Sequence, residues 1–217
     1  MDTTISVYAR PVGGVCGATR VFPDILQTAA KMLKKAEGGI LQDSFVTHVA
    51  DRLVLIMIHD PEISVNALKD EVFRKAKEMS AKKHLFSNPV GPSGCGITFA
   101  ERDSEPVILF LAGSEKIAWH EILPFNPDCI SDGVLLIARA EGEFPSVAEF
   151  CEKFASPSLN AKGICPVSLC DSSVVRTKIT PVVGLGFSLA GGKLTGPVDL
   201  FDNPAFTAAR LLASQIK

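Results

Sequence analysis

The fold of this chain is organised around the stretch Phe45–Asp60, which reads FVTHVADRLVLIMIHD. Two apolar runs lie on either side of the polar break Ala50-Asp51-Arg52, and this pattern predicts a β-hairpin in a buried sheet. The few polar residues of the stretch are His48, Asp51, Arg52, His59 and Asp60. A carboxylate and an imidazole beside a turn suit a metal or phosphate site, and they equally suit ordinary turn and strand-end positions. We expect the two histidines to be hydrogen-bonded core residues, as strand-borne histidines in an apolar run usually are.

The composition is that of an ordinary folded protein. The chain has 217 residues, enough for one substantial core or two small domains, and 47% of them are apolar. The formal net charge of −2 gives no general attraction for nucleic acid or anionic membranes, so neither is an expected partner. The longest apolar run, residues 53–58, is far shorter than the ~20 residues of a membrane-spanning helix. The start of the chain lacks the features of a signal peptide, which predicts a cytoplasmic protein.

The cysteines form no C-x-x-C pair, and the spacing between cysteines and histidines matches no zinc site. The six are Cys16, Cys95, Cys129, Cys151, Cys165 and Cys170. In a reducing compartment we expect them to be buried small apolar residues. Cys165 and Cys170 are close enough in sequence to form a redox pair, although no other feature of the sequence supports one.

The order of the predicted elements indicates an α+β fold. Before residue 113, the sequence predicts strands at 3–9, 45–49, 53–59, 96–100 and 106–112, with helices opening at Pro23 and at Ser64. Residues 114–132 read as irregular. The remainder predicts strands at 133–140, 167–169, 179–189 and 193–195, with helices at 146–154 and from Asn203. Two sets of strands, each with helices outside, predict a single domain of residues 1–217, built as a layered α-β-β-α sandwich.

The segment from Arg10 to Thr19 contains three glycines and a proline, which predicts a loop. Such a loop suits the cradling of a phosphate, and it also suits a simple turn from strand to helix. The absence of a Walker lysine pattern favours the simple turn.

Several segments together resemble one family, the class V fructose-1,6-bisphosphatases, which are archaeal-type fructose-bisphosphate aldolase/phosphatases. The matching segments occur in family order over nearly the whole chain, at residues 4–7, 47–59, 101–106, 132–136, 184–187 and 196–206. The resemblance implies a bound sugar bisphosphate, several Mg²⁺ ions on clustered aspartates and a lysine that forms a Schiff base. It also implies a homo-oligomer. This chain is similar to a shortened member of the family.

The family's functional residues carry over onto few positions of this chain. Its paired aspartates at the hairpin turn fall on Asp51 and Arg52, and its Lys-Asp-Asp motif falls on residues 130–132, so the Schiff-base lysine is absent. Three further ligand positions fall on Pro11, on Ala18 or Phe22, and on Gly113. Asp51 and Asp132 remain as candidate Mg²⁺ ligands, with Asp171 as a weaker one.

These substitutions predict a homologue without catalytic residues that binds a phosphorylated metabolite. Arg10, Arg20 and Arg52 are the expected phosphate-binding residues, because guanidinium groups suit anions. One alternative is an active Mg²⁺-dependent sugar-phosphate phosphatase with a reduced metal site. Another is an interaction subunit without a small-molecule site.

Overall fold

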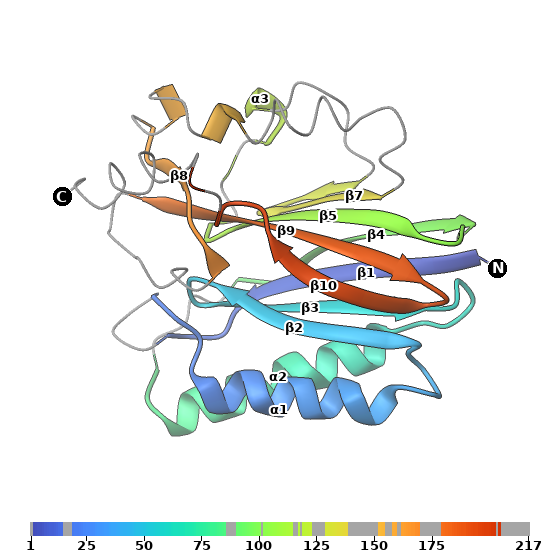
Figure 1. The fold of residues 1–217 in the computed structure, drawn as a ribbon. Coiled ribbons are helices and arrows are strands. Elements are labelled where there is room, and N and C mark those ends of the chain that lie inside the picture. Colours follow the sequence, from blue (N-terminus) through green and yellow to red (C-terminus); the bar gives the residue numbers. More distant parts are fainter. Residues whose placement is uncertain are drawn as a thin grey trace.

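Two β-sheets face each other in the computed structural model, which describes residues 2–14, 19–85, 90–100, 102–114, 117, 119–122, 129–138, 152–154, 158–159, 162–169, 179–202 and 204 (Figure 1). The first sheet has the strand order β2-β3-β1-β4, and the second has the order β10-β9-β5-β7-β6. The strands of the first sheet are β1 Asp2–Pro11, β2 Asp43–Val49, β3 Arg52–His59 and β4 Ser93–Ala100. Those of the second are β5 Glu105–Ala112, β6 Cys129–Ser131, β7 Val134–Ala138, β9 Thr180–Ala190 and β10 Lys193–Asp199, and β8 Ile164–Pro166 pairs with β9 in parallel.

The predicted β-hairpin is confirmed. β2 and β3 pair antiparallel with Val49 opposite Arg52, so Ala50 and Asp51 form the turn. Ala50 has a φ of +50°, the left-handed value that tight hairpin turns use. β3 is buried along its whole length because its alternate side chains face the helices and the second sheet. Its unbroken apolar run is therefore that of an inner strand covered on both faces.

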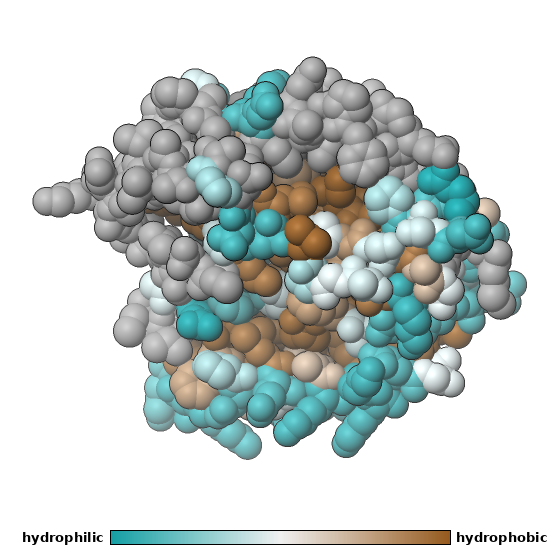
Figure 2. Space-filling view, in the orientation of Figure 1, coloured by the Kyte–Doolittle hydropathy of each residue, from teal (hydrophilic) through white to brown (hydrophobic). Residues whose placement is uncertain are grey.

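Two helices, α1 Pro23–Ala36 and α2 Asn66–Lys82, cover the outer face of the first sheet (Figure 1). α1 buries Ile25, Ala29 and Leu33 at helical spacing. Its opposite face is polar, and Figure 2 shows hydrophilic residues gathered along the helix side of this view. Among the residues that the structure describes, no helix is long and apolar enough to cross a membrane.

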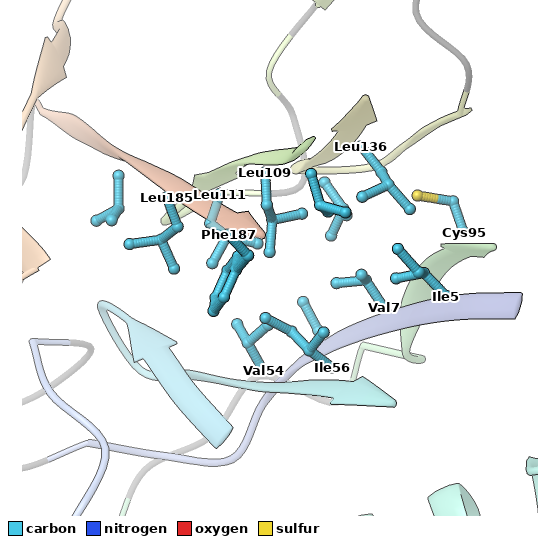
Figure 3. Close-up of a cluster of buried hydrophobic side chains, with 14 of the residues drawn as sticks. Ile5, Val7, Val54, Ile56, Cys95, Leu109, Leu111, Leu136, Leu185 and Phe187 are labelled. Carbon is cyan, nitrogen blue, oxygen red and sulfur yellow. The ribbon is translucent and has the colours of Figure 1, made fainter. Parts of the chain in front are cut away.

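The space between the two sheets is filled by apolar side chains from both (Figure 3). The first sheet contributes among others Ile5, Val7, Val54 and Ile56, and the second contributes Leu109, Leu111, Leu136, Leu185 and Phe187. Phe187 meets Phe45 edge-on, with 5.5 Å between the ring centroids. The sheets therefore share one core, and separating them would expose it to water.

The α+β class is confirmed, and the helix layer over the first sheet is as predicted. The outer face of the second sheet is covered by side chains that include Trp119 and Ile122 of the short helix α3 Trp119–Ile122. The helices predicted at 146–154 and from Asn203 lie mostly outside the described residues. The outer helix layer of the predicted α-β-β-α sandwich therefore stays a prediction.

Two sequence-based assignments were wrong. The strand predicted at 167–169 lies three residues earlier, as β8. The chain leaves the sheet there because the carboxylate of Asp199 accepts hydrogen bonds from Ser168 Oγ at 2.8 Å and from the backbone of Leu169 at 2.6 Å. The segment 114–132, predicted to be irregular, contains α3 and β6. Both are so short that their periodicity gives no signal.

Candidate functional site

The hairpin turn lies where the ends of both sheets meet, and we call this region the turn site. It comprises residues 48–52 with Ser93, residues 112–113 and residues 131–133. The backbone of Val12 donates to the carbonyl oxygen of Asp51 at 3.0 Å, which ties the end of β1 to the turn. The turn site contains four of the positions at which the family's metal ligands were expected from the sequence, namely Asp51, Arg52, Gly113 and Asp132.

Arg52 forms the centre of the turn site. Its side chain alternates with those of Val54 and Ile56, so it points toward the second sheet. Its guanidinium donates from Nη1 to the carbonyl oxygen of Ala112 at 2.9 Å, and from Nη2 to the carbonyl oxygen of Asp132 at 3.0 Å. Nη2 also donates to Ser93 Oγ. With 1% of its surface exposed, Arg52 joins β3 to β4, β5 and the β6–β7 turn.

Gly133 makes room for this arginine. Its φ of +72° lies in the left-handed region, which glycine adopts without strain. A Cβ atom at this position would collide with Arg52 Nη1 and would lie 2.7 Å from the carbonyl oxygen of Ser114. Position 133 therefore needs glycine for two independent reasons.

Of the three candidate metal ligands, Asp171 lies outside the described residues, and the other two differ in their surroundings. Asp51 is 7% exposed, whereas Asp132 is exposed to solvent. Asp132 meets Arg52 through its backbone oxygen. The described part of the chain contains no group of three or more histidine, cysteine, aspartate or glutamate side chains placed to hold a metal ion.

His48 is buried behind the turn, and its Nδ1 lies 3.3 Å from the carbonyl oxygen of Ala50. Burial lowers the pKa of this imidazole, the hydrogen bond with the Ala50 carbonyl opposes this in part, and the positive charge of Arg20 makes a smaller lowering contribution. The ring is therefore neutral at neutral pH. At the other end of β3, His59 Nε2 lies 2.9 Å from Ser6 Oγ. The expectation that both histidines are hydrogen-bonded core residues is confirmed.

The three predicted phosphate-binding arginines differ in exposure and in the face of the first sheet on which they lie. Arg10 lies opposite Leu53 in the β1–β3 register, so it leaves the sheet on the helix-facing side, where Nε donates to the carbonyl oxygen of Val90 at 3.2 Å. His48 also lies opposite Leu53 and shares this side. Arg20 is exposed and acts electrostatically on His48. Arg52 points to the opposite face of the sheet from Arg10 and His48.

A groove of about 410 Å³ lies away from the turn site, between α1 and the first half of β2. Its lining includes Lys31, Lys34, Glu37, Ser44 and Phe45. The sequence analysis did not identify this groove, because helix and strand are brought together only by packing.

Three residues of the turn site were also missed, namely Ser93, Ser131 and Gly133. The two serines have no local signal, since their partners lie 41 and 37 residues away in the chain. Gly133 follows Asp132, and an Asp-Gly pair between two strands is a turn signal that could have identified it.

A family profile and several curated proteins similar to this chain all point to one family. A family profile described as "Fructose-1,6-bisphosphatase" matches residues 2–124 and 130–217. Three similar proteins are each named fructose-1,6-bisphosphate aldolase/phosphatase. That of Ignicoccus hospitalis is 26% identical over 99% of this chain and 83% of its own length. The Moorella thermoacetica protein is 29% identical over 98% of this chain and 84% of its own length. The Methanothermobacter marburgensis protein is 27% identical over 100% of this chain and 89% of its own length.

This chain is shorter than those relatives within the aligned region. The alignment with the Ignicoccus protein spans 322 residues whereas this chain has 217, so about a third of the alignment falls opposite gaps here. The profile match nevertheless extends from near the first residue to the last. The family resemblance seen in the sequence is thereby confirmed, and the chain belongs to the fructose-1,6-bisphosphatase family.

Proposed function

We propose that this chain binds a phosphorylated sugar beside the hairpin turn, on the helix-facing side of the first sheet where Arg10 lies, and does not carry out the metal-assisted hydrolysis of its family. The observation that carries the proposal is the buried guanidinium of Arg52 at the centre of the turn site. In this proposal, the charge of Arg52 keeps Mg²⁺ away from the turn site, and Arg10 and Arg20 bind the phosphate.

Electrostatics supports this role for Arg52. An arginine stays protonated in proteins, so its charge is permanent. At an effective dielectric constant of about 20, a divalent cation about 4 Å away would be repelled by roughly 8 kcal/mol. Mg²⁺ also requires several oxygen ligands at near-octahedral geometry. The described residues offer the carboxylates of Asp51 and Asp132 with a guanidinium near them, and they do not fit a multi-ion site.

The phosphate would be bound by Arg20 and Arg10. Arg20 is exposed and therefore accessible to a ligand, and Arg10 lies on the same side of the first sheet as His48. A guanidinium binds phosphate oxygens through two parallel hydrogen bonds. Arg52 is less suited to direct contact, because its described hydrogen bonds go to protein oxygens and its side chain is buried. It would instead hold together the strands that frame the site.

The finer fold assignment is part of the same proposal. We expect residues 1–217 to form one domain with the class V layered α-β-β-α sandwich. The shared core between the sheets and the helices on the first sheet support this expectation. Assembly into a homo-oligomer is likewise a prediction from the family.

Two measurements on the same protein sample test the function. The first is release of inorganic phosphate from fructose 1,6-bisphosphate with and without Mg²⁺, where we expect none. The second is calorimetric titration with fructose 1,6-bisphosphate in EDTA, where we expect binding that Arg20→Ala weakens at least tenfold. Lys34→Ala is the matched control, because this cation lies in the groove away from the turn site.

Each competing function predicts a different result. Phosphate release that requires Mg²⁺ and is lost in Asp51→Asn would establish an active phosphatase. Absence of both binding and hydrolysis would favour an interaction subunit. Binding that is equally weakened by Arg20→Ala and Lys34→Ala would show that the anion is attracted by surface charge in general.

A further inference from the structure

Two cysteines meet at the seam between the sheets. Cys95 lies on β4 and Cys129 on β6, and these are the terminal strands of their respective sheets. Both side chains belong to the core between the sheets. In Figure 3 the sulfur of Cys95 points toward Leu136, the residue that lies opposite Cys129 in the β6–β7 register. Cys129 is also the neighbour that most strongly raises the pKa of the Cys95 thiol, so the two thiols lie next to each other.

The neighbouring residues bridge the same seam, so the contact between the thiols is one of a series. Gly94 donates its backbone N–H to Ser131 Oγ at 3.2 Å. One residue further, Ser93 Oγ and the carbonyl oxygen of Asp132 both accept from Arg52 Nη2. β4 and the segment 129–132 therefore run antiparallel beside each other, although they belong to different sheets. These two bridges hold the seam beside the cysteines and so limit how far apart the two thiols can lie.

We propose that Cys95 and Cys129 are a reversible disulfide site that covalently closes this seam, with a small disulfide such as oxidised glutathione as the oxidant. The inference does not depend on the proposed function. It concerns the two thiols and the packing of β4 against β6 alone.

The exposure of the two thiols sets the order of the reaction. Cys129 is half-buried and Cys95 is buried, so Cys129 is the accessible one. Its thiolate attacks one sulfur of oxidised glutathione, the S–S bond of glutathione breaks, and one glutathione leaves as a thiolate. Cys95 then loses its proton and attacks Cys129 Sγ, which releases the second glutathione. The two protein thiols lose two protons and two electrons in total, and one oxidised glutathione is reduced to two thiols.

The surroundings of Cys95 predict slow oxidation of the native protein. Its contact with Cys129 and its burial raise the pKa of the Cys95 thiol well above the ordinary value. The thiolate is the reactive form, so the second step should accelerate as the pH rises. Oxidation during refolding avoids this kinetic limit, because the thiols are then exposed before the core closes.

The test is refolding of the reduced full-length chain in a glutathione redox buffer, followed by tryptic digestion without reductant. Cleavage after lysine and arginine places Cys95 in the peptide 84–102 and Cys129 in the peptide 117–139, each with a single cysteine. We expect a linked pair of these peptides that dithiothreitol separates. We also expect the oxidised protein to melt about 5–10 °C above the reduced protein, because the link closes a long loop in the unfolded chain.

Variants make the result specific. Cys129→Ser should abolish both the linked peptides and the difference in Tm, whereas Cys165→Ser, which changes another buried cysteine, should retain both. Recovery of the reduced fold is monitored by circular dichroism and by the fluorescence of the single tryptophan, Trp119. If the chain refolds and the two peptides stay unlinked, or if either cysteine links to a different one, the proposal is overturned.

Discussion

Removal of the Arg52 side chain is the perturbation that most directly probes how the two sheets are held together. Arg52→Ala deletes three described hydrogen bonds, to Ala112, Asp132 and Ser93. Two of these acceptors are backbone carbonyl oxygens that would lose a donor, that of Ala112 at a buried site and that of Asp132 at a part-buried one. A buried acceptor left without a partner costs about 1–3 kcal/mol, and the loss is offset in part because a buried charge is no longer desolvated. We expect the free energy of unfolding to fall by about 3 kcal/mol.

Urea denaturation measures this loss, and the fluorescence of Trp119 and far-ultraviolet circular dichroism serve as independent probes. For a protein of this size the expected decrease in Tm is roughly 10 °C. Arg52→Lys should lose about half as much, because an ammonium group keeps the charge but cannot reach all three acceptors. The control is Arg74→Ala. The Arg74 side chain is 60% exposed and pairs with Glu78 on α2, so its loss should cost less than about 1 kcal/mol.

A loss below about 1 kcal/mol in Arg52→Ala, with the dependence on urea unchanged, would refute this reasoning. It would mean that water replaces the guanidinium at little cost and that the turn site is open. The same result would weaken the proposed role of Arg52 as a resident cation, because an open site has room for a hydrated metal ion.

Two further predictions concern the same region. Gly133→Ala should destabilise the protein by at least about 3 kcal/mol in urea denaturation. The new Cβ would collide with the Arg52 guanidinium, and alanine would also be strained at this positive φ. Gly191→Ala, at a φ of +56° with open space around it, should lose only about 1 kcal/mol, and equal losses would exclude the collision as the cause. Because the pKa of His48 is lowered in the fold, its neutral form contributes stability that is present above pH ~6.5 and is lost as the pH falls toward the folded pKa. His48→Gln should therefore reduce the pH dependence of the unfolding free energy below pH ~6.5, and identical slopes in the parent protein and the variant would contradict the assignment to His48.

The elements with a long, regular pattern could be predicted from the sequence. The hairpin is one of them, because an apolar run interrupted by a short polar break has few other stable arrangements. The helix that buries Ile25, Ala29 and Leu33 is another. Prediction failed at β6 and β8, whose three-residue strands are held by their neighbours. The position of β8 also depends on Asp199, a carboxylate about thirty residues away in the chain.

The candidate site was predictable in its position but not in its chemistry. The sequence places Asp51 and Arg52 at the turn, and the resemblance marks that turn as the family's metal-binding position. The sequence does not show which face each arginine uses, because that depends on the β1–β3 register. The sequence therefore predicts that Arg10 and Arg52 bind the same phosphate, although their side chains leave the sheet on opposite faces.

For the cysteines too, burial was predictable from the sequence, whereas the contact between two of them was not. The expectation of buried residues holds for Cys95 and Cys165, and Cys129 is half-buried. Cys16, Cys151 and Cys170 lie outside the described residues, so their burial and the pairing of Cys165 with Cys170 stay predictions. The contact between Cys95 and Cys129 had no sequence signal, because it joins the last strands of two different sheets.

The amino-acid sequence by itself determined the family, the α+β class and the hairpin. These depend on local periodicity, turn chemistry and the order of motifs, all of which can be read along one chain. Only the tertiary structure decided that Arg52 is a buried link between the sheets, that Arg10 lies on the opposite face of the first sheet from it, and that two distant thiols meet. These features depend on strand register and on how one sheet packs against the other, and the interactions that fix both connect residues far apart in the sequence.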